Sequence, residues 1–297
     1  MADLPEVTNV LLSVVGNLDD PAFHECRLLA TAISEEFAPV TLEIKALVET
    51  DYLDFLQKIT KEIGGDAYNH KSSPFVYYNG CNYVGGVVEF RKWARKVYEI
   101  ALDNEQSIYD EIASKAKDSW MKNSNNSFCY MDVQIVGEPQ PTRVLIEMHD
   151  DLCPNTCDNF RRLCTGQSGR SYVGSPFHRV MKDGYVQGGD IDGGRGDGGD
   201  SASGGTFADE GFAVSHGRAG IVSMANVGPH TNKSQFFVTL KNMSWLDKKC
   251  VAFARVVFGM GVFNQINNLP EENQRPKELP SIVAAGIEEV KTREDTK

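Results

Sequence analysis

The sequence of 297 residues changes its pattern near residue 128, and this change limits the folds open to the chain. Before it, apolar runs that suit buried strands alternate with segments whose apolar residues recur at helical spacing. After it, short strand signals are separated by Gly, Pro and Asn turns, and only two segments, near 156–164 and 259–267, have helical spacing. We therefore predict two domains, over residues 1–100 and 128–297, of which the second is an antiparallel barrel or sandwich.

The first hundred residues predict the element order β-α-β-α-β-β-α. Val10–Val15 is a continuous apolar run, which favours a buried strand. Asn79-Gly80 separates Phe75–Tyr78 from Cys81–Val84, and this dipeptide between two apolar runs is a strong hairpin signal. With Pro74 directly before the hairpin, the order resembles the thioredoxin and glutaredoxin fold, in which that proline is cis. The resemblance implies a thioredoxin-like domain.

The segment where that fold carries its CxxC motif is altered in this chain. It reads Phe23-His24-Glu25-Cys26, so Phe23 holds the place of the attacking cysteine. Dithiol exchange needs a thiol of low pKa at the start of the helix. We therefore expect a redox-inactive domain, with a single-thiol role for Cys26 as the alternative.

Residues 101–127 predict a linker helix that ends in a polar turn. Ile108, Ile112, Ala116 and Trp120 recur at intervals of four, as on one face of a helix. We interpret this as a helix docked on one domain. The alternative is a stripe that binds a partner protein.

Charge and composition exclude several classes of function. The net charge is −11, with 12 basic against 20 acidic residues in 1–127 and 18 against 21 in 128–297, so neither half has the basic surface that nucleic acid requires. No apolar run approaches the roughly 20 residues that span a bilayer. The first residues, MADLPEV, are acidic and do not resemble a signal peptide. We expect a cytoplasmic protein without nucleic-acid or membrane partners.

Metal and cofactor sites are not predicted. The seven cysteines are an odd number scattered over both halves, which indicates free thiols, and Cys153, Cys157 and Cys164 lack zinc-site spacing. The six histidines form no metal motif. The run DIDGGRGDGGD has neither a phosphate-loop GK[ST] nor the closing glutamate of a calcium loop, so we interpret it as a structural loop.

The stretch FHRVMKDGYVQGGD, residues 177–190, combines Arg179 and Gln187 with no nucleophile nearby. Arginine stays protonated, so Arg179 can only donate hydrogen bonds and supply charge. Rotation about an X-Pro bond breaks no covalent bond but faces a barrier of about 18–20 kcal/mol from amide resonance. A guanidinium that donates to the prolyl nitrogen as the amide twists stabilises the transition state without a nucleophile.

The motifs FHRV, QGGD, GGRGDGGDSASGGTF, GIVSMANVGPHTNKSQFFVTL and SWLD follow in this order. Over residues 128–290 the chain resembles the cyclophilin family of peptidyl-prolyl isomerases. The resemblance implies a closed, eight-stranded antiparallel β-barrel with two helices. It also assigns the catalytic arginine to Arg179 and the glutamine that orients it to Gln187. The positions that it implies for the proline pocket and peptide groove are His178, Gly196, Ala225, Asn226, Gln235, Phe237, Trp245 and Leu246.

Four positions depart from the family pattern. Gly184 and Tyr185 replace a phenylalanine and a methionine of the pocket floor, Cys250 replaces a histidine, and Val227 replaces an alanine beside the groove. The loss of the phenylalanine predicts weaker proline binding. Tyr185 could refill part of that space.

We therefore predict an X-Pro isomerase of weak activity that acts on proline-containing segments of other proteins. The alternative is a non-catalytic adaptor that binds assembly partners through the thioredoxin-like domain or the linker helix. This pairing of domains is similar to a divergent cyclophilin-like branch associated with motile cilia, which suggests the cilium or axoneme as an alternative location.

Overall fold

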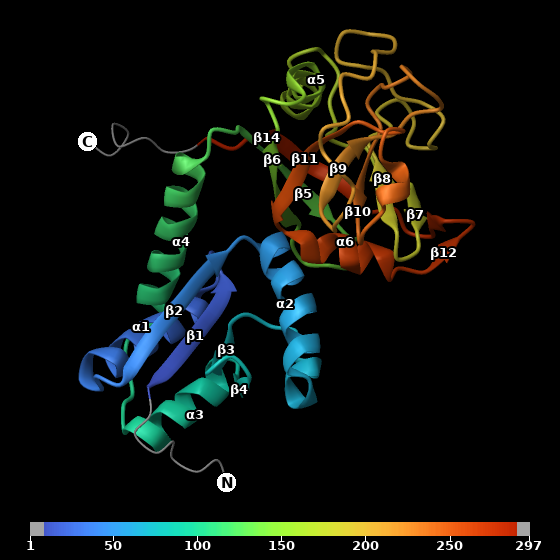
Figure 1. Ribbon diagram of the computed structural model, residues 1–297. Coiled ribbons are helices and arrows are strands. Elements are labelled where there is room, and N and C mark those ends of the chain that lie inside the picture. The colour runs from blue at the N-terminus through green and yellow to red at the C-terminus, as the bar shows by residue number, and fades with distance from the viewer. Residues whose placement is uncertain (1–8, 290–297) are drawn as a thin grey trace, which may run out of the picture. The chain divides into compact units, whose positions relative to one another are not determined.

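The computed structural model describes residues 9–289, and the chain divides into two compact units, residues 1–123 and 124–297 (Figure 1). The acidic start of the chain, from which we argued for a cytoplasmic protein, lies outside the described residues. The predicted linker, 101–127, is divided between the two units because its helix falls in the first one.

The first unit contains a four-stranded sheet in the order β2-β1-β3-β4. Its strands are β1 (Val10–Asn17), β2 (Val40–Leu47), β3 (Phe75–Tyr78) and β4 (Asn82–Gly85). Its helices are α1 (Pro21–Glu36), α2 (Glu49–Ile63), α3 (Val87–Tyr98) and α4 (Gln106–Asn123), with the short 3-10 helix η1 (Gly65–Asn69) after α2. β1 runs parallel to β2 and antiparallel to β3. The predicted element order is confirmed up to α3.

Turn and cap residues explain where these elements begin and end. Asp20 caps α1 by accepting a hydrogen bond from Ala22 N at 3.0 Å, and Gly64 ends α2 with φ of 69°. Asn79 and Gly80 have φ of 48° and 79°, the left-handed pair that a type I′ hairpin turn requires, so the predicted hairpin is confirmed. The Ser73–Pro74 bond is cis.

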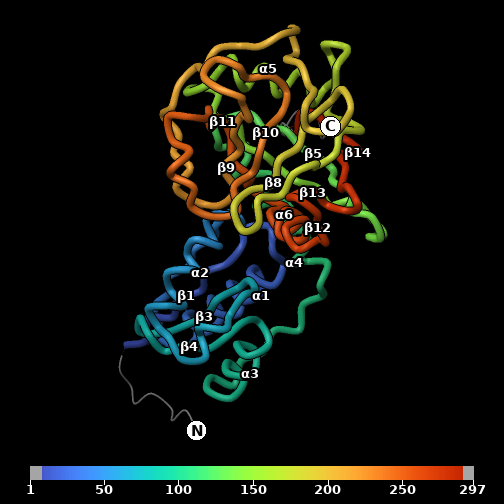
Figure 2. The backbone as a smooth tube through the Cα atoms, turned by 90° about the vertical axis from the view of Figure 1, so that its right-hand side faces the viewer, coloured from blue at the N-terminus to red at the C-terminus, as the bar shows by residue number. Residues whose placement is uncertain are grey.

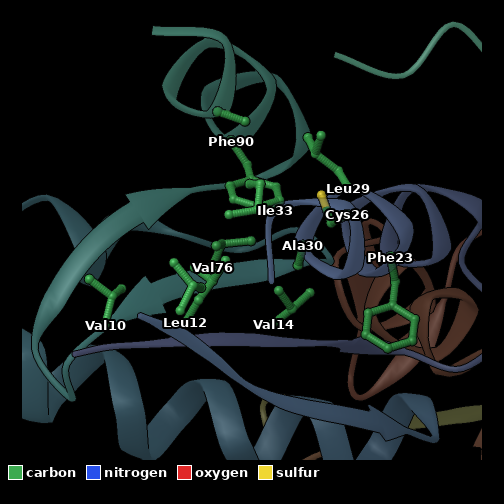
Figure 3. Packing of buried hydrophobic residues seen from close by; sticks show 12 residues of the cluster. Val10, Leu12, Val14, Phe23, Cys26, Leu29, Ala30, Ile33, Val76 and Phe90 are labelled. Atoms are coloured by element: carbon green, nitrogen blue, oxygen red, sulfur yellow. The ribbon is translucent and has the colours of Figure 1, made fainter. Parts of the chain in front are cut away.

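Strand β1 is buried on both faces, as its apolar run predicts, except at Leu11, which is 41% exposed. Val10, Leu12 and Val14 alternate into a core shared with α1 and α3 (Figure 3). Val15 points the other way and packs with Tyr52 and other residues of α2. The helices therefore cover the two faces of this sheet.

Helix α4 packs against α1, but through a different face from the predicted one. Its buried residues are Tyr109, Ala113 and Met121, whereas Ile108 is 43% exposed. The predicted stripe was thus displaced by one residue. Tyr109 is 3% exposed, and the spacing of apolar residues alone does not show which of two adjacent stripes is buried.

The second unit contains an eight-stranded antiparallel sheet in the order β14-β5-β6-β11-β9-β10-β8-β7. Its strands are β5 (Phe128–Gln134), β6 (Thr142–Met148), β7 (Arg179–Met181), β8 (Tyr185–Gly188), β9 (Ile221–Met224), β10 (Phe236–Thr239), β11 (Ala252–Phe258) and β14 (Ser281–Ile287). β12 (Glu271–Glu272) and β13 (Arg275–Pro276) form a separate two-stranded sheet, and η2 (Ser244–Leu246) is a 3-10 turn. Helices α5 (Pro154–Thr165) and α6 (Met260–Asn267) lie at opposite ends of the curled sheet (Figures 1 and 2) and confirm the two predicted helices.

The prediction of a closed barrel is wrong, because the edge strands β7 and β14 are not paired. Within residues 9–289 the segment before β7 bridges to the β14 edge, through the pair Pro176 and Ser281 and backbone hydrogen bonds such as Phe177 N to Pro280 O, 2.8 Å. Two of these residues, Pro176 and Pro280, have no N–H to donate. A regular ladder therefore cannot form at the seam, and the sheet stays open.

Candidate functional site

The register of three neighbouring strands places the central residues of the site in one row. Arg179 of β7 is paired with Gln187 of β8, and Gln187 is paired with Phe237 of β10. Paired residues project to the same face of a sheet. Tyr185 lies two residues before Gln187 and shares that face. A cation, an amide and two aromatic rings therefore meet on one side of the sheet.

This face forms one wall of a groove with a volume of about 570 Å³. It brings together twelve of the fourteen residues singled out from the sequence: Arg179, Tyr185, Gln187, Gly196, Ala225, Asn226, Val227, Gln235, Phe237, Trp245, Leu246 and Cys250. Sequence reasoning missed five further lining residues: Asp197, Gly198, Thr206, Thr231 and Lys233. These five lie on loops without a regular period, although the glycine-rich run did indicate the first two.

His178 and Gly184 do not line the groove. The His178 ring is 4% exposed and lies under Gly196, where an added Cβ would come within 2.8 Å of His178 Cδ2. His178 therefore supports the loop instead of touching the groove directly. At Gly184 an added Cβ would lie 3.1 Å from Met181 Cγ and 3.2 Å from Met181 O, so this position faces its own hairpin.

Tyr185 fills the floor of the groove. Its side chain is 8% exposed, and its ring centroid lies 5.0 Å from that of Phe237. Leu246 and the buried Met243 complete the same apolar cluster. Of the two readings of the altered floor, a hole left by Gly184 or a space refilled by Tyr185, the structure favours the second.

The Arg179 side chain is held by a residue that the sequence did not indicate. Arg179 Nε donates to Gln274 Oε1 at 2.9 Å, and its Cζ lies 5.8 Å from the centre of the Tyr185 ring. Gln187, the expected orienting partner, donates instead from Nε2 to Gln235 Oε1 at 2.8 Å. Gln274 lies 95 positions away in the sequence, and nothing in the local pattern marks it.

Gln235 connects this row to the glycine-rich loop. Its Nε2 donates to Gly196 O at 3.1 Å and to Gly198 O at 2.8 Å. The carboxylate of Asp190 holds the same loop from within by accepting from four backbone amides, among them Gly196 N at 2.7 Å. Burial opposes ionisation of Asp190, but these hydrogen bonds outweigh it and lower its pKa.

The rim of the groove is exposed and partly charged. Trp245 is 53% exposed, with Lys249 Nζ 5.6 Å from the centre of its ring, and Val227 is 96% exposed. Asn226 Nδ2 donates to Lys249 O at 2.8 Å, so its side chain braces the rim. These residues offer both apolar and hydrogen-bonding surface to an extended peptide.

Cys250 occupies the place where the family resemblance implies a histidine. Burial raises the pKa of its thiol to about 11, so the group stays neutral and protonated near pH 7. It can therefore add apolar surface but cannot act as a base. In residues 9–289 no three His, Cys, Asp or Glu side chains gather as metal ligands would.

Known proteins support the family assignment. A model of the family described as "Cyclophilin type peptidyl-prolyl cis-trans isomerase/CLD" matches residues 130–287. The chain is 35% identical over 294 residues to a Mus musculus protein named "Probable inactive peptidyl-prolyl cis-trans isomerase-like 6", covering 96% of this chain and 93% of the mouse protein. The Homo sapiens protein of the same name is 34% identical over 285 residues, covering 93% and 91%.

The family model and the relatives show that the chain belongs to the cyclophilin-type peptidyl-prolyl cis-trans isomerase family. The curled antiparallel sheet and the groove that Arg179 lines are consistent with this assignment. The chain is a divergent member, because its pocket floor departs from the family pattern at Gly184 and Tyr185. Within the described residues no helix is both long enough and apolar enough to cross a membrane.

Proposed function

We propose that the second unit binds proline-containing segments of other proteins and accelerates their cis–trans isomerisation weakly. The observation that carries this proposal is that Arg179 lines the same groove as Phe237 and Leu246. The apolar side chains suit a pyrrolidine ring, and the guanidinium lies on the wall beside them. Catalysis of X-Pro rotation needs both: an apolar surface that holds the proline ring and a hydrogen-bond donor beside it.

The chemistry follows from the donors that Arg179 keeps. Its Nε is engaged by Gln274, and no residue among 9–289 accepts a hydrogen bond from its Nη atoms. These N–H groups can donate to the prolyl nitrogen as the amide twists and its lone pair localises. Because that lone pair is delocalised in the planar ground state, the interaction strengthens in the transition state and lowers the barrier.

Weak turnover follows from the filled floor. Tyr185 occupies apolar space under the groove, so a proline ring is held at a shallower depth and with less apolar contact. Burial of apolar area stabilises a complex by roughly 25 cal/mol per Å², so a shallower site binds less tightly. We therefore expect low affinity together with a functional arginine.

Peptide titration monitored by NMR tests where binding occurs. A peptide containing Ala-Pro is expected to shift the amide signals of Gln235, Phe237 and Leu246, whereas the peptide with alanine in place of proline is expected to leave them unchanged. Equal shifts with both peptides, or shifts confined to other residues, would contradict proline recognition in this groove.

A second candidate function is a non-catalytic adaptor that binds assembly partners. The altered pocket and the word inactive in the names of its relatives favour it. In this reading the groove holds a proline-containing segment without turning it over. The two candidates differ in one observable, the rate of X-Pro exchange at saturating protein.

We also propose that the first unit is a thioredoxin-like domain that docks on partner proteins and performs no dithiol chemistry. Its strand order supports the fold, and the complete burial of Phe23 and Cys26 supports the loss of redox function. The location that we propose is the cytoplasm, from charge and composition, with the cilium or axoneme as an alternative that rests on the resemblance alone.

A further inference from the structure

Gln274 contacts β7 in two ways. Its side-chain Oε1 accepts from Arg179 Nε at 2.9 Å, and its backbone carbonyl accepts from Val180 N at 2.6 Å. One residue is thus bonded both to the guanidinium and to the peptide unit that follows Arg179. No local pattern indicates this contact, and the family resemblance assigned the orienting role to Gln187.

The turn that carries Gln274 is itself fixed. Asn273 and Gln274 have φ of 52° and 65°, the left-handed pair of a type I′ turn between β12 and β13. The next residue, Arg275, donates from Nη2 to Gly194 O at 3.0 Å and from Nη1 to Arg195 O at 3.3 Å. The hairpin is therefore tied both to β7 and to the glycine-rich loop, and it presents the Gln274 carboxamide from a restrained backbone.

An arginine side chain has many rotamers, and holding it in a single one costs conformational entropy. A reaction that needs one particular rotamer is slowed by this cost. Arginine offers five N–H donors in a planar fork. Gln274 uses the donor at Nε, which fixes the plane of the guanidinium and leaves the Nη donors at the groove that Arg179 lines. A donor held in place before the substrate arrives needs no reorganisation during the reaction.

We propose that Gln274 is a positioning residue for Arg179, setting the orientation in which the guanidinium meets a prolyl peptide. The proposal rests on the isomerase function proposed above. It assigns to Gln274 the orienting role that Gln187, bonded to Gln235, does not perform in this structure.

Two variants of Gln274 and one control test the proposal. Gln274→Gly removes the acceptor and suits the left-handed turn, so the hairpin is expected to keep its shape. Gln274→Glu keeps an acceptor at the same distance along the side chain. Gln265→Ala removes another exposed glutamine, from α6, and serves as the matched control.

Two readouts are measured on each protein: kcat and KM for an Ala-Pro peptide, and the solvent exchange of the Arg179 Nε–H signal by NMR. Gln274→Gly is expected to lower kcat roughly tenfold with KM within about twofold, because orientation and not binding is lost. The Nε–H should exchange faster in this variant. Gln274→Glu is expected to restore both readouts, and Gln265→Ala to match the wild type.

An unchanged Arg179 Nε–H signal in Gln274→Gly overturns the inference whether or not the protein turns over. Changed exchange with unchanged kcat in an active protein also overturns it, because the contact then has no effect on the reaction. Absence of turnover in the wild type contradicts the proposed function instead. In that case faster Nε–H exchange in Gln274→Gly still supports Gln274 as the residue that holds Arg179.

Discussion

At the scale of single residues, the altered pocket is explained by Tyr185 and not by the glycine before it. Tyr185 packs on Phe237 and leaves the groove floor filled, whereas Gly184 faces Met181. The sequence identified both departures because they lie inside a recognisable motif. It could not decide which side chain fills the space, since that depends on how the β7–β8 hairpin turns.

This assignment predicts the effect of a larger side chain at position 184. Gly184→Phe is expected to destabilise the protein by roughly 1–3 kcal/mol, because its Cβ meets both the side chain and the backbone oxygen of Met181. It is not expected to tighten binding of a proline peptide. Urea unfolding and calorimetric titration measure the two effects.

Gly261→Ala, on the open face of α6, is the matched control. No heavy atom lies within 4 Å of its added Cβ, so it should be neutral or stabilise by about 0.5–1 kcal/mol. Wild-type stability combined with tighter peptide binding in Gly184→Phe would show that a phenylalanine-shaped hole exists after all.

At the scale of elements, the glycine-rich loop is organised around one carboxylate. Asp190 accepts hydrogen bonds from four loop amides, and the loop in turn supplies Gly196 and Gly198 to the groove. The glycine-rich sequence indicated a structural loop, but it did not show that the Asp190 carboxylate holds the loop together. We therefore expect the groove wall to depend on the ionised state of Asp190, which is 1% exposed and does not itself line the groove.

Asp190→Asn is expected to lower the free energy of unfolding by roughly 1.5–3 kcal/mol near neutral pH, since amide hydrogen bonds to a charged acceptor are lost. Because the pKa of Asp190 is lowered in the folded state, its contribution is complete above its ordinary value of 3.8 and disappears as the pH falls through the lowered pKa. Urea unfolding of both proteins from pH 7 to pH 2.5 measures this difference.

The stability difference between wild type and Asp190→Asn should therefore shrink only below about pH 3.8, the ordinary value for this group. Asp151→Asn, which makes the same change at an exposed position, controls for the loss of charge. A difference that stays constant down to the lowest pH would argue against the carboxylate as the centre of the loop.

Elements with strong local signals were the ones that the sequence predicted well. Asn79-Gly80 specified its hairpin because few other residues adopt two left-handed conformations in succession. The buried face of α4 was misplaced by one residue, because its packing on α1 is a long-range contact that the local spacing does not encode. Closure of the barrel was also predicted wrongly, since it depends on pairing between β7 and β14, which are far apart in the chain. Contacts between residues far apart in the chain, such as Arg179 with Gln274, could not be predicted from local sequence patterns.

At the scale of the whole molecule, the chain combines a cyclophilin-type second unit, residues 124–297, with a first unit, residues 1–123, for which we predict no dithiol chemistry. Cys26 is fully buried, and desolvation raises the pKa of its thiol well above the ordinary value. Phe23, at the position where the resemblance implies the attacking cysteine, is also fully buried. Each unit has its own buried apolar core, with Phe90 in the first and Phe236 and Phe253 in the second.

The intact protein is therefore expected to show no disulfide reductase activity. Insulin reduction with dithiothreitol as electron donor measures it, and Cys26→Ser should give the same background rate as the wild type. Cys81→Ser, which removes the exposed cysteine of the same unit, is the matched control. A rate that falls only in Cys26→Ser would contradict a redox-inactive first unit.

The central claim, that Arg179 catalyses X-Pro rotation in this groove, is tested most directly by NMR exchange on an Ala-Pro peptide with the intact protein. We predict weak exchange cross-peaks between the cis and trans forms above the level in buffer. Arg179→Ala should lower the exchange rate at least tenfold, as loss of a preorganised donor does. Lys277→Ala, which removes an exposed positive charge from the same unit, should leave it unchanged. Exchange equal to buffer in folded wild type, or undiminished in Arg179→Ala, would contradict the account.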